Sequence, residues 1–236
     1  MVGSWVALVG FGIGIVATND GLLSPLQERL RASAVTIGGE TATVANWLGV
    51  PFWVVVAAVA IGAGAWLWRS PPAAFQGGWS WRRSGVVMGL IGTAAWLASV
   101  PTGRYYGLSV TEPIYGWFSF LLTGESGRLG WAAFMFLGLI GGSHWAARRA
   151  GEFQWRAPGA TRLLQALGGG LLMGVGAGIA GGCNIGHSLT GIPLLSLGSL
   201  AATGAIILGV WAGAYLMFGA QAFVLYGRVV HATKRP

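Results

Sequence analysis

Six segments of this chain are apolar over lengths that approach the thickness of a lipid bilayer. A helix needs about 20 mainly apolar residues to cross the hydrocarbon core. The segments are residues 4–17, 50–68, 85–100, 130–147, 163–181 and 197–219, of which the first is the shortest. We therefore predict an all-α, polytopic membrane protein with about six transmembrane helices, in which residues 1–236 form one integral domain embedded in the lipid bilayer.

The composition also indicates a chain that is solvated by lipid. Hydrophobic residues make up 54% of it and charged residues only 8%, which is too few for the surface of a soluble domain. The 42 glycines suit membrane helices that pack closely. The net charge is +8, but the basic residues form no patch interleaved with aromatic side chains, so we expect no nucleic-acid partner.

Basic residues are concentrated in alternate loops. They follow the second segment (Arg69, Arg82, Arg83), the fourth (Arg148, Arg149, Arg156, Arg162) and the sixth (Arg228, Lys234, Arg235). Because Lys and Arg are enriched in cytoplasmic loops, this distribution predicts a multi-pass protein with both termini in the cytoplasm. The first 20 residues lack the basic start and the cleavage site of a signal peptide, so we expect them in the mature protein.

Two of the remaining loops are too apolar to be ordinary solvated loops. Residues 100–126 and 183–199 are short apolar pieces interrupted by Gly, Pro, Ser and Thr. Non-helical backbone is tolerated at membrane depth only where protein or a water-filled cavity surrounds it. We therefore predict that both loops re-enter the membrane and line a pathway. A short amphipathic helix is expected around SPLQERLRA, residues 24–32.

Two glycine-rich segments of the chain resemble each other. GFGIGIVATND begins at Gly10 and GVGAGIAGGCN begins at Gly174, and both contain a G-x-G-x-G-I core. In that register, Asn19 lies opposite Cys183. Internal repeats with interrupted helices are typical of transporters, whose substrate site lies between the repeats. The predicted repeat units are residues 4–68 and 163–219, around a central helix pair at 85–147.

The chemistry of the chain is densest around its only cysteine, Cys183. Gly181 and Gly182 precede it and free the backbone to turn, while a run of polar side chains follows it: Asn184, His187, Ser188 and Thr190. Backbone amides and hydroxyls at a helix end can bind a small anion, and a thiol is a soft, polarizable group suited to contact with another sulfur. A single cysteine excludes an internal disulfide and a multi-cysteine metal site, so no metal or cofactor is expected.

Other roles for these residues stay open at this point. A lone membrane cysteine often serves only to fill space, and a histidine near a helix end is often a satisfied interfacial residue. Cys183 could also act as a nucleophile with His187 as its base. No carboxylate lies nearby to orient the histidine, so we expect a protein that is not an enzyme.

The stretch GIAGGCNIGHSLTG resembles the signature of the YeeE/YedE family of sulfur-compound transport membrane proteins. The matching residues include Gly181, Gly182, Cys183, Asn184, Gly186 and His187, and GRYYGLS, which ends at Ser109, resembles the other broken loop of the family. The resemblance implies a bacterial inner-membrane transporter with a narrow hourglass pathway, in which cysteines pass thiosulfate along by thiol-to-sulfur hydrogen bonds. This chain is shorter than the full-length members of the family, and it lacks the further cysteines that they carry in their earlier half. Either one thiol suffices, or the solute differs, or a partner subunit contributes.

We accordingly predict uptake of a small sulfur-containing anion, thiosulfate first. Cys183 would contact the terminal sulfur. The oxygens would be contacted by nearby backbone amides and by the side chains of Asn184, His187, Ser188 and Thr190. Arg104 would attract the anion, while Ser109 and Asn19 would line the pathway. The alternatives are a membrane-embedded thiol enzyme or sulfur carrier that forms a persulfide on Cys183, and a structural subunit without a solute. The sequence does not decide between thiosulfate and sulfite, sulfide or a selenium analogue as the solute. The driving ion also stays open, as does the presence of a homodimer or a partner subunit.

Overall fold

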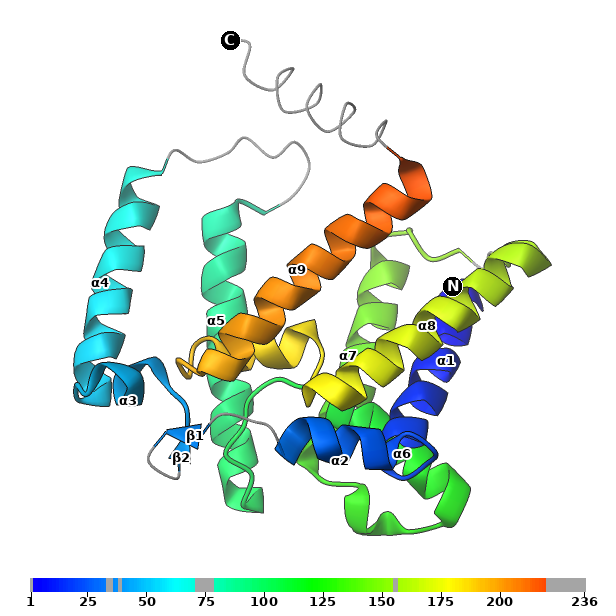
Figure 1. The fold of residues 1–236 in the computed structure, drawn as a ribbon. Coiled ribbons are helices and arrows are strands. Elements are labelled where there is room, and N and C mark those ends of the chain that lie inside the picture. The colour runs from blue at the N-terminus through cyan, green and yellow to red at the C-terminus, as the bar shows by residue number, and fades with distance from the viewer. Residues whose placement is uncertain (1, 33–35, 38–39, 71–78, 155–156, 220–236) are drawn as a thin grey trace.

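The computed structural model describes residues 2–32, 36–37, 40–70, 79–154 and 157–219 (Figure 1). The basic residues Arg156, Arg228, Lys234 and Arg235 lie outside these ranges. The α-helices are α1 (Val2–Asn19), α2 (Ser24–Ala32), α3 (Val44–Leu48), α4 (Phe52–Arg69), α5 (Trp81–Ser99), α6 (Thr111–Thr123), α7 (Trp131–Arg149), α8 (Ala160–Ala180) and α9 (Leu197–Phe218). The short turns are η1 (Val100–Thr102), η2 (Ser126–Arg128) and the π-helical η3 (Ile185–Gly191), and one antiparallel hairpin pairs β1 (Thr36–Ile37) with β2 (Glu40–Thr41).

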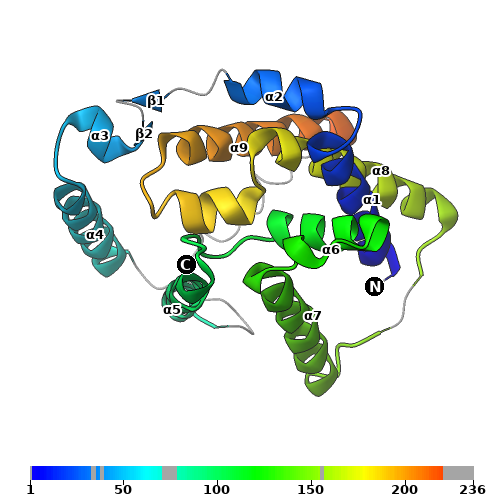
Figure 2. The same ribbon diagram turned by 90° about the horizontal axis from the view of Figure 1, so that it is seen from below.

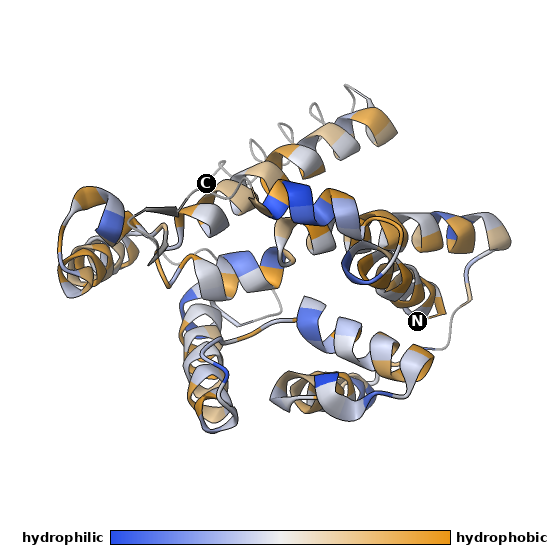
Figure 3. Cartoon of the chain, turned by 60° about the horizontal axis from the view of Figure 1, so that its bottom comes forward, coloured by the Kyte–Doolittle hydropathy of each residue, from blue (hydrophilic) through white to orange (hydrophobic). Residues whose placement is uncertain are grey.

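The predicted all-α membrane architecture is confirmed. Within the described residues, five helical segments are long and apolar enough to cross a membrane: α1, α4, α5 with η1, α8 and α9. Hydrophobic residues predominate along these helices in Figure 3, whereas α2 carries strongly hydrophilic ones. The remaining predicted segment, residues 130–147, forms α7, a 19-residue helix that ends in Arg148 and Arg149 and is not among these five.

Helices α1 and α8 pack directly backbone against backbone. A Cβ atom at Gly10 would lie 2.3 Å from the carbonyl oxygen of Leu167, and one at Gly174 would lie 2.2 Å from that of Phe11. The contacts advance together along both helices, so α1 and α8 run parallel and side by side (Figures 1 and 2). Only glycine allows this approach, which explains the glycine-rich composition of both segments. The assignment of the two larger repeat units stays a prediction.

The two interrupted loops contact each other beside this helix pair. After α5, the chain forms η1, continues without regular structure to Val110, and then forms α6, which packs against α1 and α7 (Figure 2). After α8, the chain forms η3 before α9 begins. Tyr106 Oη donates to the Gly186 carbonyl at 2.8 Å, and Thr190 Oγ1 donates to the Leu108 carbonyl at 2.8 Å. The two loops are therefore joined by side-chain hydrogen bonds to backbone.

The amphipathic helix expected at residues 24–32 is present as α2. It lies across the ends of α1 and α8, in the lower half of the molecule in Figure 1. Gln27 fixes it there, because its Nε2 donates to Asn19 Oδ1 at 2.6 Å and to the Gly178 carbonyl at 3.0 Å. Gln27 is only 4% exposed, and its hydrogen bond to Gly178 is buried.

Candidate functional site

Cys183 lies immediately after a glycine-terminated helix. Helix α8 ends at Ala180, and Gly181 adopts a left-handed conformation with φ 80°, which glycine tolerates without strain. Gly182 follows, and a Cβ atom there would lie 3.3 Å from His187 Nε2. The Gly-Gly step thus turns the chain sharply, so that Cys183 packs half-buried at the end of the helix.

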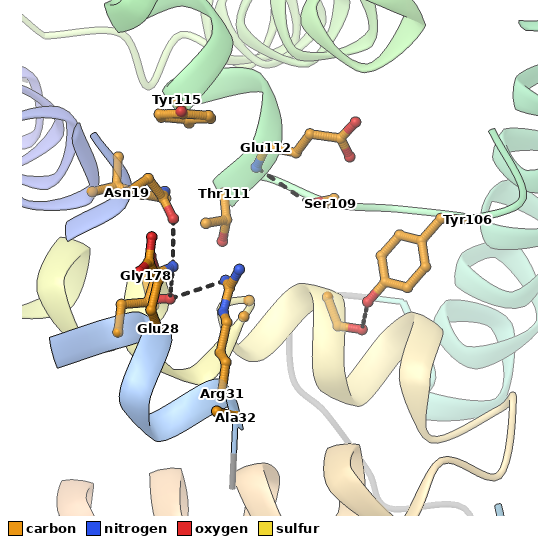
Figure 4. Close-up of a pocket in the computed structure, with 16 residues that line it drawn as sticks. Asn19, Glu28, Arg31, Ala32, Tyr106, Ser109, Thr111, Glu112, Tyr115 and Gly178 are labelled. Atoms are coloured by element: carbon orange, nitrogen blue, oxygen red, sulfur yellow. Dashed lines mark hydrogen bonds between the residues drawn. The ribbon is translucent and has the colours of Figure 1, made fainter. Parts of the chain in front are cut away.

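A cavity of about 850 Å³ opens beside this turn, and we call it the polar cavity (Figure 4). Five of the site residues predicted from sequence line it: Asn19, Ser109, Gly181, Gly182 and Gly186. Sequence analysis did not single out its other polar lining residues, which are Gln27, Glu28, Arg31, Tyr106, Thr111, Glu112 and Tyr115. The cavity therefore combines the ends of α1 and α8 with α2 and the start of α6.

A second cavity, of about 400 Å³, includes Cys183 and Asn184 in its wall, and we call it the apolar cavity. Most of its remaining lining is aliphatic or aromatic and comes from α1, α6 and α8. Four buried residues form a cluster: Phe11, Ile15, Ile114 and Ala177. Ile15 and Ala177 line the polar cavity, Phe11 and Ile114 line the apolar cavity, and Cys183 packs against this cluster. The thiol thus lines the apolar cavity and packs against residues that line both cavities.

The polar residues after Cys183 separate into different environments. His187 is 9% exposed, its Nδ1 is 3.1 Å from Ser199 Oγ, and its buried Nε2 has no hydrogen-bond partner among the described residues. Ser188 Oγ donates to Asn184 Oδ1 at 2.7 Å and lies 3.2 Å from Thr203 Oγ1 on α9. Ser188 and Thr190 line a different cavity, of about 580 Å³, beside α5. Asn184 therefore lines the same cavity as the thiol, whereas Ser188 and Thr190 lie at a different one.

Arg104 has a structural environment in which its charge is already paired. Its guanidinium forms a two-pronged ion pair with Glu112, with Nε 3.0 and 2.9 Å from the two carboxylate oxygens. Its Nη1 also donates to the carbonyls of Tyr106 at 2.6 Å and Gly107 at 2.9 Å. Arg104 is not among the residues that line the polar cavity. Its donors hold the interrupted loop against the first turn of α6.

We expect Arg104→Gln to reduce stability. The substitution leaves Glu112 unpaired and removes two donors from backbone carbonyls, which should cost about 1–3 kcal/mol. Thermal unfolding in detergent measures the effect, with Arg29→Gln, an exposed arginine on α2, as the matched control. An Arg104 variant as stable as the control, but weaker in anion uptake, would instead support the role in anion attraction that the sequence suggested.

The Cys183 thiol and the Tyr106 phenol, both in the interrupted loops, have pKa values shifted from their ordinary ones. Burial raises the pKa of the Cys183 thiol, but donors to its thiolate, led by the Thr111 side chain and the amide of Gly186, outweigh burial and bring the pKa below its ordinary value. Burial raises the pKa of Tyr106, which keeps its phenol protonated as the donor to Gly186.

The residues that sequence reasoning missed come mainly from α2 and from the start of α6. Gln27 and Arg31 belong to the amphipathic segment that the sequence did mark, and Thr111 belongs to the interrupted loop that it marked. Their periodicity and turn residues indicated the local structure of both segments. Nothing in that pattern indicated that α2 folds back onto α8. The residues that join the two helices, Gln27 and Gly178, are 151 positions apart in the sequence, so no local pattern links them.

Comparison with known proteins places the whole arrangement in context. The family model described as sulphur transport matches residues 1–212. A protein named thiosulfate transporter TsuA from Spirochaeta thermophila is 34% identical over 227 residues, which cover 91% of this chain and 68% of the relative. A protein of the same name from Escherichia coli K12 is 30% identical over 239 residues, which cover 92% of this chain and 66% of the relative. The chain thus spans about two thirds of the length of these relatives.

Proposed function

This chain belongs to the sulphur transport family, and on that premise we propose that it transports a small sulfur-containing anion, thiosulfate first, and is not an enzyme. Both relatives are named as thiosulfate transporters, which supports the choice of solute. Five helices among the described residues are long and apolar enough to cross a membrane, which supports a multi-pass protein with a route for the anion through the membrane.

One structural observation carries the proposal. A half-buried thiol lines the apolar cavity and packs against a cluster whose residues line both cavities, and we propose that this cluster is the constriction of the pathway. A cysteine that served only to fill space would need no cavity beside it. The position of Cys183 supports a role in the passage of a solute from one cavity to the other.

The chemistry of thiosulfate fits a route that passes the polar cavity first and Cys183 second. Its oxygens accept hydrogen bonds, whereas its terminal sulfur is large, soft and weakly hydrated. Stripping water from an anion is costly unless other donors replace it, and the polar cavity offers amide, hydroxyl and guanidinium donors. The Cys183 thiol can then contact the terminal sulfur as the anion passes the constriction.

The direction of transport follows from the distribution of basic residues. The arginine-rich loops after α4 and α7 support a cytoplasmic location for that side of the bundle, at the bacterial inner membrane. The polar cavity lies at the other side, beside α2, so the anion would reach the polar cavity first and leave toward the cytoplasm. With one cysteine in the chain, the pathway contains a single thiol contact, unless a second copy or a partner subunit supplies another.

Uptake into proteoliposomes tests the proposal directly. Purified protein is reconstituted, radiolabelled thiosulfate is added outside, and internal label is measured over time. We expect saturable uptake that excess unlabelled thiosulfate suppresses, and no uptake into vesicles without protein. Vesicles with correctly folded protein that accumulate no label above the empty control would contradict the proposed function.

The alternative of a persulfide-forming thiol enzyme or carrier is separated by a mass measurement. A hydrogen-bonding contact leaves the cysteine unmodified, whereas in a carrier the Cys183 thiolate attacks the sulfane sulfur of thiosulfate, breaks the S–S bond of the anion, releases sulfite and becomes a persulfide. We expect the intact mass of the protein to be unchanged after exposure to thiosulfate. A stoichiometric gain of one sulfur atom that is lost in Cys183→Ser would favour the carrier.

A further inference from the structure

A groove of about 570 Å³ separates the start of α1 from α7, and we call it the α1–α7 groove. Trp5 and Leu8 of α1 line one wall, and Phe136, Ile140 and His144 of α7 line the other. Helix α7 packs against α6, but only two alanines of its first turn are buried. The rest of α7 therefore leaves an open, mainly apolar space beside α1.

The length of the groove matches one leaflet of a bilayer. Its lining on α7 runs from Phe136 to Ala147, which corresponds to a rise of about 16 Å along the helix. The hydrocarbon core of a bilayer is about 30 Å thick, so one leaflet contributes about half of that depth. The transmembrane helix of a protein partner would cross both leaflets, whereas the acyl chain of a lipid occupies only one. The groove therefore fits an acyl chain.

Aromatic and basic side chains are stacked at the end of the groove where α7 terminates. His144 and Phe153 both line the groove, and their rings meet edge to face with centroids 4.7 Å apart. The guanidinium carbon of Arg148 lies 5.1 Å from the centroid of the Phe153 ring. Arg148 forms no ion pair with a carboxylate of the described residues, so its N–H donors can bind a phosphate placed at this end.

The charge around this end of the groove favours an anionic head group over a zwitterionic one. Residues 148–162 contain four arginines and a single acid, Glu152. Basic pockets between transmembrane helices on the cytoplasmic side bind the head groups of anionic lipids, and the arginines predict that this side is cytoplasmic. Trp5, which is 49% exposed, lines the groove one turn of α1 beyond Leu8, as expected for an interfacial tryptophan.

We propose that the α1–α7 groove binds one anionic phospholipid of the cytoplasmic leaflet, with an acyl chain along Leu8, Phe136 and Ile140 and the phosphate at His144 and Arg148. This inference does not depend on which solute the protein transports. Leu8 also lines the apolar cavity, so the bound lipid would cover the flank of that cavity next to α7.

Native mass spectrometry of the purified protein in mild detergent tests the site, because it counts the lipids bound to each molecule. Phosphatidylglycerol and phosphatidylcholine with identical acyl chains are titrated, and the Kd of the first bound lipid is measured. We expect phosphatidylglycerol to bind more tightly, and Arg148→Gln to raise its Kd about fivefold while leaving that of phosphatidylcholine unchanged. Ala147→Phe fills the groove beside His144 and should weaken the binding of both lipids.

Arg149→Gln is the matched control, because it removes the same charge from the next position of the same helix. The guanidinium carbon of Arg149 lies 4.2 Å from the ring centroid of Trp145, which does not line the groove, so we expect native Kd values. Equal affinity of the native protein for the two lipids would overturn the proposal, as would equal losses in Arg148→Gln and Arg149→Gln. A protein dimer that Ala147→Phe dissociates would assign the groove to a second copy of the chain instead. Arg148→Gln and Ala147→Phe change different properties, so either one tests the site if the other fails to fold.

Discussion

Cys183→Ser is expected to lower thiosulfate uptake by about tenfold or more, the equivalent of losing roughly 1.4 kcal/mol of stabilisation at the rate-limiting step. Serine keeps a hydrogen-bond donor of similar size but replaces the polarizable sulfur with a hard oxygen. The terminal sulfur of thiosulfate would then pass the constriction without a matching contact. Initial uptake rates in proteoliposomes measure the effect, normalised to the amount of monodisperse protein.

Met173 provides a matched control for this substitution. It lines the same apolar cavity as Cys183 and carries the other type of protein sulfur, a thioether. Met173→Leu removes that sulfur while nearly preserving volume, so we expect native uptake. Uptake by Cys183→Ser at the native rate would rule out the sulfur contact, and equal losses in both variants would indicate a packing effect on the cavity.

Gly174→Val is expected to have the largest effect on folding. Even the first carbon of a side chain at this position would lie 2.2 Å from the Phe11 carbonyl oxygen and 3.0 Å from the Ile15 amide nitrogen. Backbone atoms cannot yield as a flexible side chain can, so α1 and α8 would have to separate. Overpacking commonly costs about 1–3 kcal/mol, and here we expect at least the upper end.

The yield of monodisperse protein and its unfolding temperature in detergent measure this effect. Gly176→Ala is the control on the same helix, because a Cβ atom there meets nothing within 4 Å. We expect the control to match the native protein in both measurements. A stable Gly174→Val variant would mean that α1 and α8 do not pack as closely as described.

The sequence allowed the helices to be predicted because their driving force is local. Runs of apolar residues at 50–68 and 197–219 correspond to α4 and α9, since burying backbone polar groups in lipid requires a helix. The Gly181–Cys183 step likewise indicated the end of α8. The family was also recognised correctly from this short stretch, as the match over residues 1–212 confirms.

The arrangement of the site depended on contacts that no local pattern carries. Nothing local in the sequence indicates that Arg104 pairs with Glu112, because the ion pair forms only when the loop folds against α6. The amphipathic pattern of residues 24–32 does not indicate that Arg31 lines the polar cavity, because this depends on how α2 docks on the end of α8. The roles assigned to Cys183 and its neighbours stay predictions until the variants are measured.

The direct backbone contact between α1 and α8 restricts how the protein can move during a transport cycle. With the carbonyls of one helix seated against glycines of the other, sliding or rotating either helix alone would force main-chain atoms into collision. The pair must therefore behave as a fixed frame throughout the cycle. We expect exchange of access between the two sides of the bilayer to come from elements set against that frame. The loop before α6 and η3 are linked by hydrogen bonds of Tyr106 and Thr190, so these two would shift together.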